Sequence, residues 1–170
     1  MTCSTQPITK AEPNNKRIVV PNEVWVQTWL GLQKRGKGKV ESAAVWGGKR
    51  DDLSEIVEAV YFLDDLVGRF QHRGYHFVPP EALAQLFAQL QRDRRVIVAD
   101  IHTHPTGWVG LSALDKSHPI EFRPGLHAIV LPSYAQSTPS LSLAGVHEYE
   151  GGGKWRILTD KMKEAVFTFT

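Results

Sequence analysis

The sequence predicts one α/β domain of the α+β kind, in which a single mixed β-sheet is flanked by helices. Segments with helical or strand-like apolar patterns follow one another in the order α-β-β-α-β-α-β-β-β, without internal repeats. The chain has 170 residues, which suffices for one domain with a substantial core and is short for two. We expect residues 17–170 to form this domain and residues 1–16, rich in Thr, Pro, Asn and Lys, to form a flexible N-terminal tail.

The first half of the domain contains one predicted helix and two predicted strands. The helix begins at Asn22, a potential cap, and ends at Gly36, because apolar residues recur between them at near-helical spacing. Two short segments rich in β-branched and aromatic residues follow, at Val40–Trp46 and Ile56–Leu63. We expect them to form the strands of a hairpin, with Gly47 and Gly48 closing the first strand.

The second half opens with the clearest helical pattern in the chain. After Pro79 and Pro80, leucine and phenylalanine side chains recur at intervals of three and four residues up to Leu90. The continuous apolar stretch Val96–Ile101 comes next and is typical of a central strand covered on both faces. Further strands are expected at residues 126–131, 141–149 and 154–158.

Composition excludes several classes of protein. The formal net charge of +2 gives no reason to expect nucleic-acid binding. Cys3 is the only cysteine, which rules out an internal disulfide and a zinc site built from several thiolates. The first residues lack the apolar core of a signal peptide, and no segment approaches the roughly 20 apolar residues of a membrane span. We therefore expect a cytoplasmic protein without a membrane partner.

A pair of histidines extends the predicted central strand. His102 and His104 are two residues apart, so an extended backbone places both imidazoles on one face. Pro105 ends the strand, and the chain then turns toward a short helix that starts near Ser112 and carries Asp115 in its first turn. Two imidazoles and one carboxylate suit Zn²⁺ and leave a fourth position for water, as in catalytic zinc sites.

Each part of this pattern has an alternative explanation. Histidines at the end of a buried strand can be hydrogen-bonded core residues, and Ser112 with Asp115 can form a capping box at a helix start. The joint occurrence of all the parts at these spacings favours one zinc ion per chain, bound by His102, His104 and Asp115.

These residues resemble a known signature. The string His102–Pro105, six further residues and then Ser112–Asp115 is similar to the signature of the JAMM/MPN metalloproteases. Glu41 resembles the glutamate that this family places near the start of an earlier strand, and the resemblance covers about residues 41–149. It implies the JAMM/MPN fold, which is of the cytidine-deaminase-like kind.

The resemblance also implies roles for individual side chains. Glu41 would act as general base and then return the proton to the departing amine. The Ser112 hydroxyl would stabilise the oxygen of the attacked carbonyl group. Alternative acids to Glu41 are Glu55, Glu58 and Asp100, of which Asp100 lies on the strand face of the histidines and could orient one of them.

Other residues near the motif are assigned by position. Trp108, in the loop before Ser112, is predicted to contact the substrate tail, with simple packing as the alternative. His118, His127 and His147 are expected to be packed or solvated rather than additional ligands.

The resemblance implies a hydrolase that cleaves isopeptide or peptide bonds after the Gly-Gly tail of a ubiquitin-like protein. The segment between Asp115 and His127 is short, which indicates a compact enzyme of the bacterial type without the long insertion of some eukaryotic members. Such enzymes remove or mature a conjugated modifier beside E1-like and E2-like proteins in bacterial anti-phage operons.

Three other functions stay open at this point. Some MPN-fold chains are scaffold subunits without metal, but these lack the ligands that this chain has. A DNA-associated protein of the RadC kind carries a similar histidine motif and would need a basic face. A hydrolase of small amides or peptides would use the same residues on a different substrate.

Overall fold

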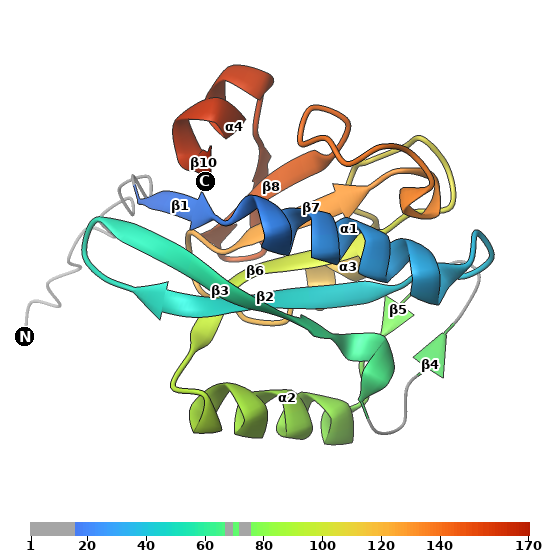
Figure 1. Ribbon diagram of the computed structural model, residues 1–170, viewed down its shortest axis with the longest axis horizontal. Helices are drawn as coiled ribbons and strands as arrows, with labels where there is room; N and C mark the ends of the chain where they lie inside the picture. The colour runs from blue at the N-terminus through green and yellow to red at the C-terminus, as the bar shows by residue number, and fades with distance from the viewer. Residues whose placement is uncertain (1–15, 67–69, 72–75) are drawn as a thin grey trace, which may run out of the picture.

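The computed structural model describes residues 16–66, 70–71 and 76–170. Its main feature is a curled, eight-stranded mixed sheet with the strand order β10-β1-β3-β2-β6-β7-β8-β9 (Figure 1). The strands of this sheet are β1 (Arg17–Val20), β2 (Ala43–Arg50), β3 (Ser54–Phe62), β6 (Val96–Thr103), β7 (His127–Leu131), β8 (Gly145–Gly151), β9 (Lys154–Ile157) and β10 (Phe167–Phe169). The expected α+β class, with one mixed sheet and flanking helices, is confirmed.

The helices and two short strands complete the described fold. The helices are α1 (Asn22–Gly36), α2 (Pro80–Arg92), α3 (Ala113–Ser117) and α4 (Asp160–Val166), with 3-10 turns at Leu63–Asp65 and Ser133–Ala135. Strands β4 (Phe70–Gln71) and β5 (His76–Phe77) pair only with each other. The tail expected at residues 1–16 lies outside the described residues except for Lys16.

Helices α1 and α2 follow the prediction closely, but one detail was wrong. Asn22 is the first helical residue rather than the cap, and the capping position belongs to Pro21, which has no side chain able to accept a hydrogen bond. Helix α2 begins at Pro80, because a proline costs nothing in the first turn, where its missing N–H would have no partner.

Two strand boundaries differ from the prediction. Strand β2 starts at Ala43 and continues through Gly47 and Gly48 to Arg50, because a β-bulge absorbs the glycines instead of ending the strand. Strand β8 starts at Gly145, and residues 141–144 form a turn.

Strands β1 and β10 and helix α4 were not predicted. Strand β1 pairs in parallel with both β10 and β3, so one of its partners comes from the far end of the chain. Segments of three or four residues carry too little periodicity to be recognised, and their pairing depends on contacts remote in sequence.

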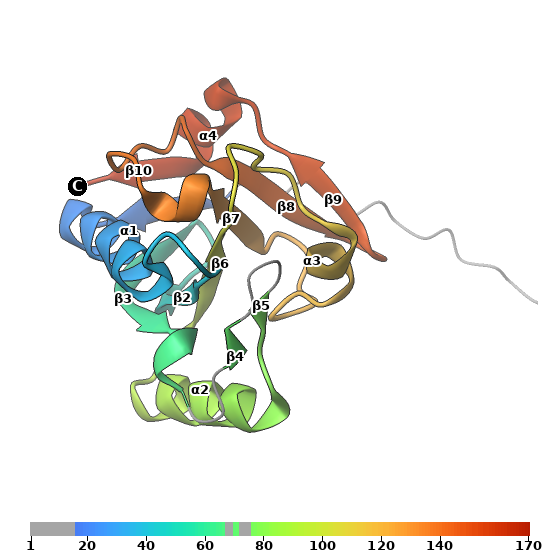
Figure 2. The same cartoon turned by 90° about the vertical axis from the view of Figure 1, so that its right-hand side faces the viewer.

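The two faces of the sheet bury separate apolar clusters. On one face, Ala44 and Trp46 of β2 pack in the cluster that contains Trp25 and Trp29 of α1. Ala43 of β2 points to the opposite face, whose cluster also contains side chains of α2. Figure 2 shows α1 and α3 on opposite sides of β6 and β7. The alternation of β2 therefore matches a strand covered on both faces.

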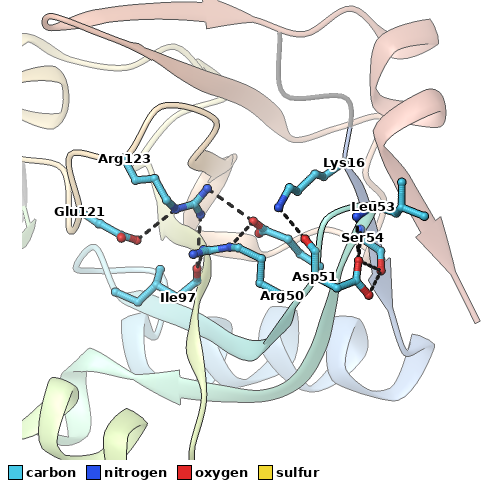
Figure 3. A network of polar contacts seen from close by, with 9 residues as sticks. Lys16, Arg50, Asp51, Leu53, Ser54, Ile97, Glu121 and Arg123 are labelled. Atoms are coloured by element: carbon cyan, nitrogen blue, oxygen red, sulfur yellow. Dashed lines mark hydrogen bonds and ion pairs between the residues drawn. The ribbon is translucent and has the colours of Figure 1, made fainter. Parts of the chain in front are cut away.

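A polar network closes the end of the sheet where β2 finishes and β6 starts (Figure 3). The Glu55 carboxylate, only 1% exposed, accepts from Arg50 Nε at 2.6 Å and lies 3.4 Å from Arg123 Nη1. Both guanidinium groups also donate to the Ile97 carbonyl oxygen, at 2.7 and 3.4 Å. This network joins β2, β3 and β6 to the loop before β7.

The helices show no membrane-spanning segment. Within the described part of the chain, none of them combines the length and the apolar character that crossing a bilayer requires.

Candidate metal centre

The two histidines of the motif lie where β6 ends. His102 is paired with Ala43 of β2 and Val130 of β7, so β6 is held on both sides at this point. His104 follows the strand, and its backbone N–H donates to the Leu131 carbonyl oxygen at 2.9 Å. Both side chains are buried, and their Nε2 atoms lie 3.2 Å apart. The predicted convergence of the two imidazoles is confirmed.

Asp115 brings the third ligand atom. Its Oδ2 lies 3.7 Å from His102 Nε2 and 3.5 Å from His104 Nε2. The same oxygen accepts the backbone N–H of Ser112 at 2.7 Å, while the Ser112 hydroxyl accepts the N–H of Asp115 at 3.2 Å. This reciprocal capping box fixes the start of α3 and orients the carboxylate toward the histidines.

The donor set fits a tetrahedral divalent cation. Ligand atoms about 2.0–2.1 Å from a tetrahedral zinc ion are separated from one another by about 3.3 Å. The three separations here run from 3.2 to 3.7 Å, so the three atoms lie close enough together to share one ion. His102, His104 and Asp115 can therefore hold one metal ion and leave a coordination position for water.

The tautomer of His104 is set by the loop that follows it. His104 Nδ1 lies 3.1 Å from the Trp108 carbonyl oxygen, which can only accept, so the ring proton belongs on Nδ1. The lone pair of Nε2 then faces His102 and Asp115. The indole of Trp108 stacks on the His104 ring with centroids 5.0 Å apart and planes 17° apart. Trp108 thus holds the ligand through both its backbone and its side chain.

The ligands perturb one another in the metal-free protein. Burial alone would raise the pKa of Asp115, but the His102 and His104 rings beside its carboxylate hold this pKa well below its usual range. Burial alone would lower the pKa of His102, but the Asp115 carboxylate beside the ring raises it above 6.5. The pocket therefore stabilises positive charge beside a carboxylate, which is the charge balance a bound cation would meet.

Glu41 and Ser112 line one cleft together with two of the three candidate ligands. This cleft of about 450 Å³ is also lined by His104, Trp108 and Asp115. Burial raises the pKa of the Glu41 carboxyl, and the nearby His104 and His102 rings oppose that rise.

The backbone beside Glu41 is fixed to the end of β6. The backbone N–H of the neighbouring Ser42 donates to the Thr103 hydroxyl at 3.0 Å. In return, the backbone N–H of Thr103 donates to the Ser42 carbonyl oxygen at 3.0 Å. Glu41 therefore lies next to the ligands although strand β2 begins only two residues later.

The alternative acids are separated by position. Glu55 belongs to the polar network at the opposite end of β2, and Glu58 forms an ion pair with Arg95 at 2.9 Å. Neither lines a cavity together with the ligands. Asp100 lines a cavity of about 60 Å³ with His102 and Asp115, and burial raises the pKa of its carboxyl to about 6. Asp100 therefore lies close to His102 and Asp115 but does not line the cleft that contains Glu41.

The three histidines expected to be packed or solvated, His118, His127 and His147, are not part of the ligand group formed by the described residues. His118 is exposed and bonds to the Ser117 hydroxyl at 2.9 Å. His127 is buried beside Phe167, and burial lowers its pKa to about 3. His147 is buried and bonds to the Val109 carbonyl oxygen, a contact with the loop between the ligands that sequence reasoning did not anticipate.

Comparison with known proteins supports the fold. No family model matches this chain. The solution structure of a protein from Desulfitobacterium hafniense is similar, with a TM-score of 0.65 and 17% sequence identity over 90% of this chain and 92% of that one. The solution structure of a protein from Salinibacter ruber is similar with a TM-score of 0.57 and 14% identity, over 82% of this chain and 88% of that one. At such identities the likeness concerns the arrangement of the backbone alone.

Proposed function

We propose that this protein is a zinc-dependent isopeptidase of the JAMM/MPN type, which cleaves after the Gly-Gly tail of a ubiquitin-like protein. The observation that carries this proposal is the meeting of His102 Nε2, His104 Nε2 and Asp115 Oδ2 at tetrahedral spacing, next to a cleft that Glu41 and Ser112 line together with His104 and Asp115. The order of these residues along the chain and the resemblance of their spacing to the JAMM/MPN signature support the same conclusion.

The metal would provide the activation that a neutral amide needs. A zinc ion held by these three ligands would polarise the substrate carbonyl and lower the pKa of a coordinated water toward about 7. Glu41 would accept the proton that this water releases and pass it to the departing amine. Its raised pKa suits a carboxylate that both takes and returns a proton near neutral pH.

The Ser112 hydroxyl would stabilise the oxygen of the attacked carbonyl group. Its hydroxyl oxygen accepts from the Asp115 N–H, so the hydroxyl proton is available to a further acceptor. Because Ser112 lines the cleft with Glu41, this proton could be donated to the carbonyl oxygen as negative charge develops on it. The capping bond holds the hydroxyl in place before substrate arrives.

Trp108 completes the proposed site as a substrate contact. Its side chain is 55% exposed and lines the cleft while one ring face packs on His104. The exposed part of the ring would contact the extended tail of the substrate. In this proposal, E1-like and E2-like proteins of a bacterial conjugation system supply the conjugate that the enzyme cuts.

The test is cleavage of a ubiquitin-like protein whose Gly-Gly terminus is joined to a reporter lysine through an isopeptide bond. The zinc-loaded wild-type protein should release the reporter, and the matched variants Glu41→Gln and His104→Ala should not. The Glu41→Gln variant should keep its zinc, whereas His104→Ala should lose it.

The other functions predict different results in the same series. Zinc binding without cleavage of any amide would favour a binding subunit. Cleavage of a dipeptide amide but not of the isopeptide conjugate would favour a hydrolase of small substrates. Binding to duplex DNA that weakens steeply with salt would favour the RadC-like function.

A further inference from the structure

The loop between the second histidine and the capping serine is held at its start by a backbone turn and further along by side chains. We call residues 105–111 the metal loop. The backbone N–H of Ser133 donates to the Thr106 carbonyl oxygen at 2.8 Å, and the N–H of Tyr134 donates to that of His104 at 2.8 Å. Both donors lie in the turn Ser133–Ala135, whose three residues have positive φ angles of 49°, 54° and 58°. Such backbone strain in non-glycine residues recurs where a local geometry must be enforced.

The far side of the metal loop is held by one side chain. His147 Nε2 lies 2.9 Å from the Val109 carbonyl oxygen. A carbonyl oxygen only accepts, so His147 carries its proton on Nε2 and donates it. His147 is 5% exposed, and burial lowers its pKa, which keeps the ring neutral in this contact. The bond fixes the loop to β8, a strand that contributes no metal ligand.

Gly145, two residues earlier on the same face of β8, makes the close approach possible. A Cβ atom at this position would lie 1.9 Å from the Val109 carbonyl oxygen and 2.9 Å from the Val109 carbonyl carbon. The contact is with backbone, so a flexible side chain cannot simply move aside. Any residue other than glycine would push the loop away from β8 and away from His147.

Two neighbouring carbonyl groups of the loop therefore bind two different imidazoles. The Trp108 carbonyl oxygen accepts from Nδ1 of the ligand His104, and the Val109 carbonyl oxygen accepts from His147. The two peptide planes that carry these carbonyl groups meet at the Val109 Cα atom, so once the Val109 carbonyl group is fixed, only the φ and ψ angles of Val109 set the orientation of the Trp108 carbonyl group. The position of the His104 ring depends in this way on a residue that does not touch the metal.

We infer that His147 is a positioning residue of the metal centre, which holds the Trp108 carbonyl group where it fixes the tautomer and the orientation of His104. This inference rests on the metal binding of the proposed function but not on its substrate. Removing a partner that orients a ligand histidine lowers metal affinity by about 10- to 100-fold. His147 does not contact His104 itself but acts through the backbone of Trp108 and Val109, so we expect the lower end of that range.

The experiment measures zinc affinity by competition with a chelator of known strength. His147→Leu removes the donor and should weaken zinc binding about 10-fold. His147→Gln, whose amide can donate from nearly the same position, should restore most of that affinity. His127→Leu is the matched control, because it removes a buried imidazole from the neighbouring strand β7 that makes no hydrogen bond to the metal loop. The zinc affinity of this variant should equal that of the wild type.

A second measurement is made on the zinc-free protein, so its result does not depend on catalytic activity. Nitrogen NMR of the His104 ring should show the proton on Nδ1 in the wild type and a mixture of tautomers in His147→Leu. If His147→Leu does not fold, Gly145→Ala tests the same inference, since it displaces the loop while His147 stays, and it should give the same two changes.

The outcomes separate this inference from the proposed function. Wild-type zinc affinity and an unchanged His104 tautomer in His147→Leu or Gly145→Ala would overturn the positioning role. A wild-type protein that binds zinc but leaves the isopeptide conjugate intact would overturn the proposed substrate, and the His147 comparison would stand.

Discussion

Asp115 Oδ2 accepts the backbone N–H of Ser112 at 2.7 Å while it faces the Nε2 atoms of both histidines. The capping box and the metal ligand therefore use the same oxygen atom, although the sequence presents them as alternatives. A helix cap orients the carboxylate before any ion arrives, which reduces the conformational freedom that binding would otherwise have to remove.

The double use of Asp115 predicts different behaviour for two substitutions. Asp115→Asn should lose zinc, because a neutral amide is a poor ligand, but should keep the capping bond, since the amide oxygen of asparagine can still accept the Ser112 N–H. Asp115→Ala should lose both and unfold in chelator with about 1 kcal/mol less stability than Asp115→Asn. Metal analysis and urea unfolding in chelator measure the two effects. Equal stability of the two variants would mean that the capping bond contributes nothing.

Zinc affinity should rise with pH between about 6 and 8. The Asp115 carboxylate raises the pKa of His102 above 6.5 in the metal-free protein, so the imidazole must release a proton when the ion binds. The His102 contribution to metal-free stability is present below pH 6.5 and is lost as pH rises through the higher folded pKa. Calorimetry in two buffers of different ionisation enthalpy should detect the proton. Heats that do not depend on the buffer would contradict this assignment.

Ser112→Ala and Ser112→Thr test the free hydroxyl proton. The alanine variant should keep zinc and lose about 100-fold or more in turnover, the usual effect of removing one oxyanion donor. It should also lose about 1 kcal/mol of stability through the helix cap. The threonine variant keeps a hydroxyl that both caps and donates, so most of both losses should be recovered. Turnover of the isopeptide conjugate and unfolding in urea check these expectations, and full turnover in the alanine variant would assign the oxyanion to another donor.

The ligand set could be predicted from the sequence because it depends on local geometry. A strand places His102 and His104 on one face, and a capping box places Asp115 at the start of a short helix. The role of His147 could not be predicted in the same way. It depends on β8 lying beside the metal loop, which follows from sheet pairing between segments remote in the sequence.

The same limit explains the missed elements. Strand β1 exists because Ile18 is paired with Phe167 near the other end of the chain, and four residues show no periodicity of their own. The bulge in β2 allows Gly47 and Gly48 to continue a strand that glycines normally end.

Removing the polar network around Glu55 should lower the stability of the protein without changing its zinc affinity. Glu55→Ala would leave Arg50 and Arg123 beside an empty, buried position, and breaking such a pair costs about 3–5 kcal/mol. The network lies at the opposite end of β2 from Glu41, so zinc affinity should not change in molecules that remain folded. Urea unfolding and chelator competition on the same variant separate the two quantities. A loss of zinc affinity in the folded protein would show that the two ends of the sheet are coupled.

Acid should destabilise the protein partly through His127. The buried ring has a folded pKa of about 3 against an ordinary 6.5, and neither of its nitrogen atoms has a hydrogen-bond partner. Below pH 6.5 the His127 imidazole is protonated in the unfolded chain but not in the folded one. The free energy of unfolding therefore falls by about 1.4 kcal/mol for each pH unit of acidification, until the pH nears 3. His127→Leu should remove that part of the slope and be at least as stable at pH 7, because its neighbour Phe167 is apolar. Urea unfolding between pH 4 and 7 measures the difference, with His118→Leu as a control at the surface. If the His127→Leu curve runs parallel to that of the wild type, the acid sensitivity comes from other groups.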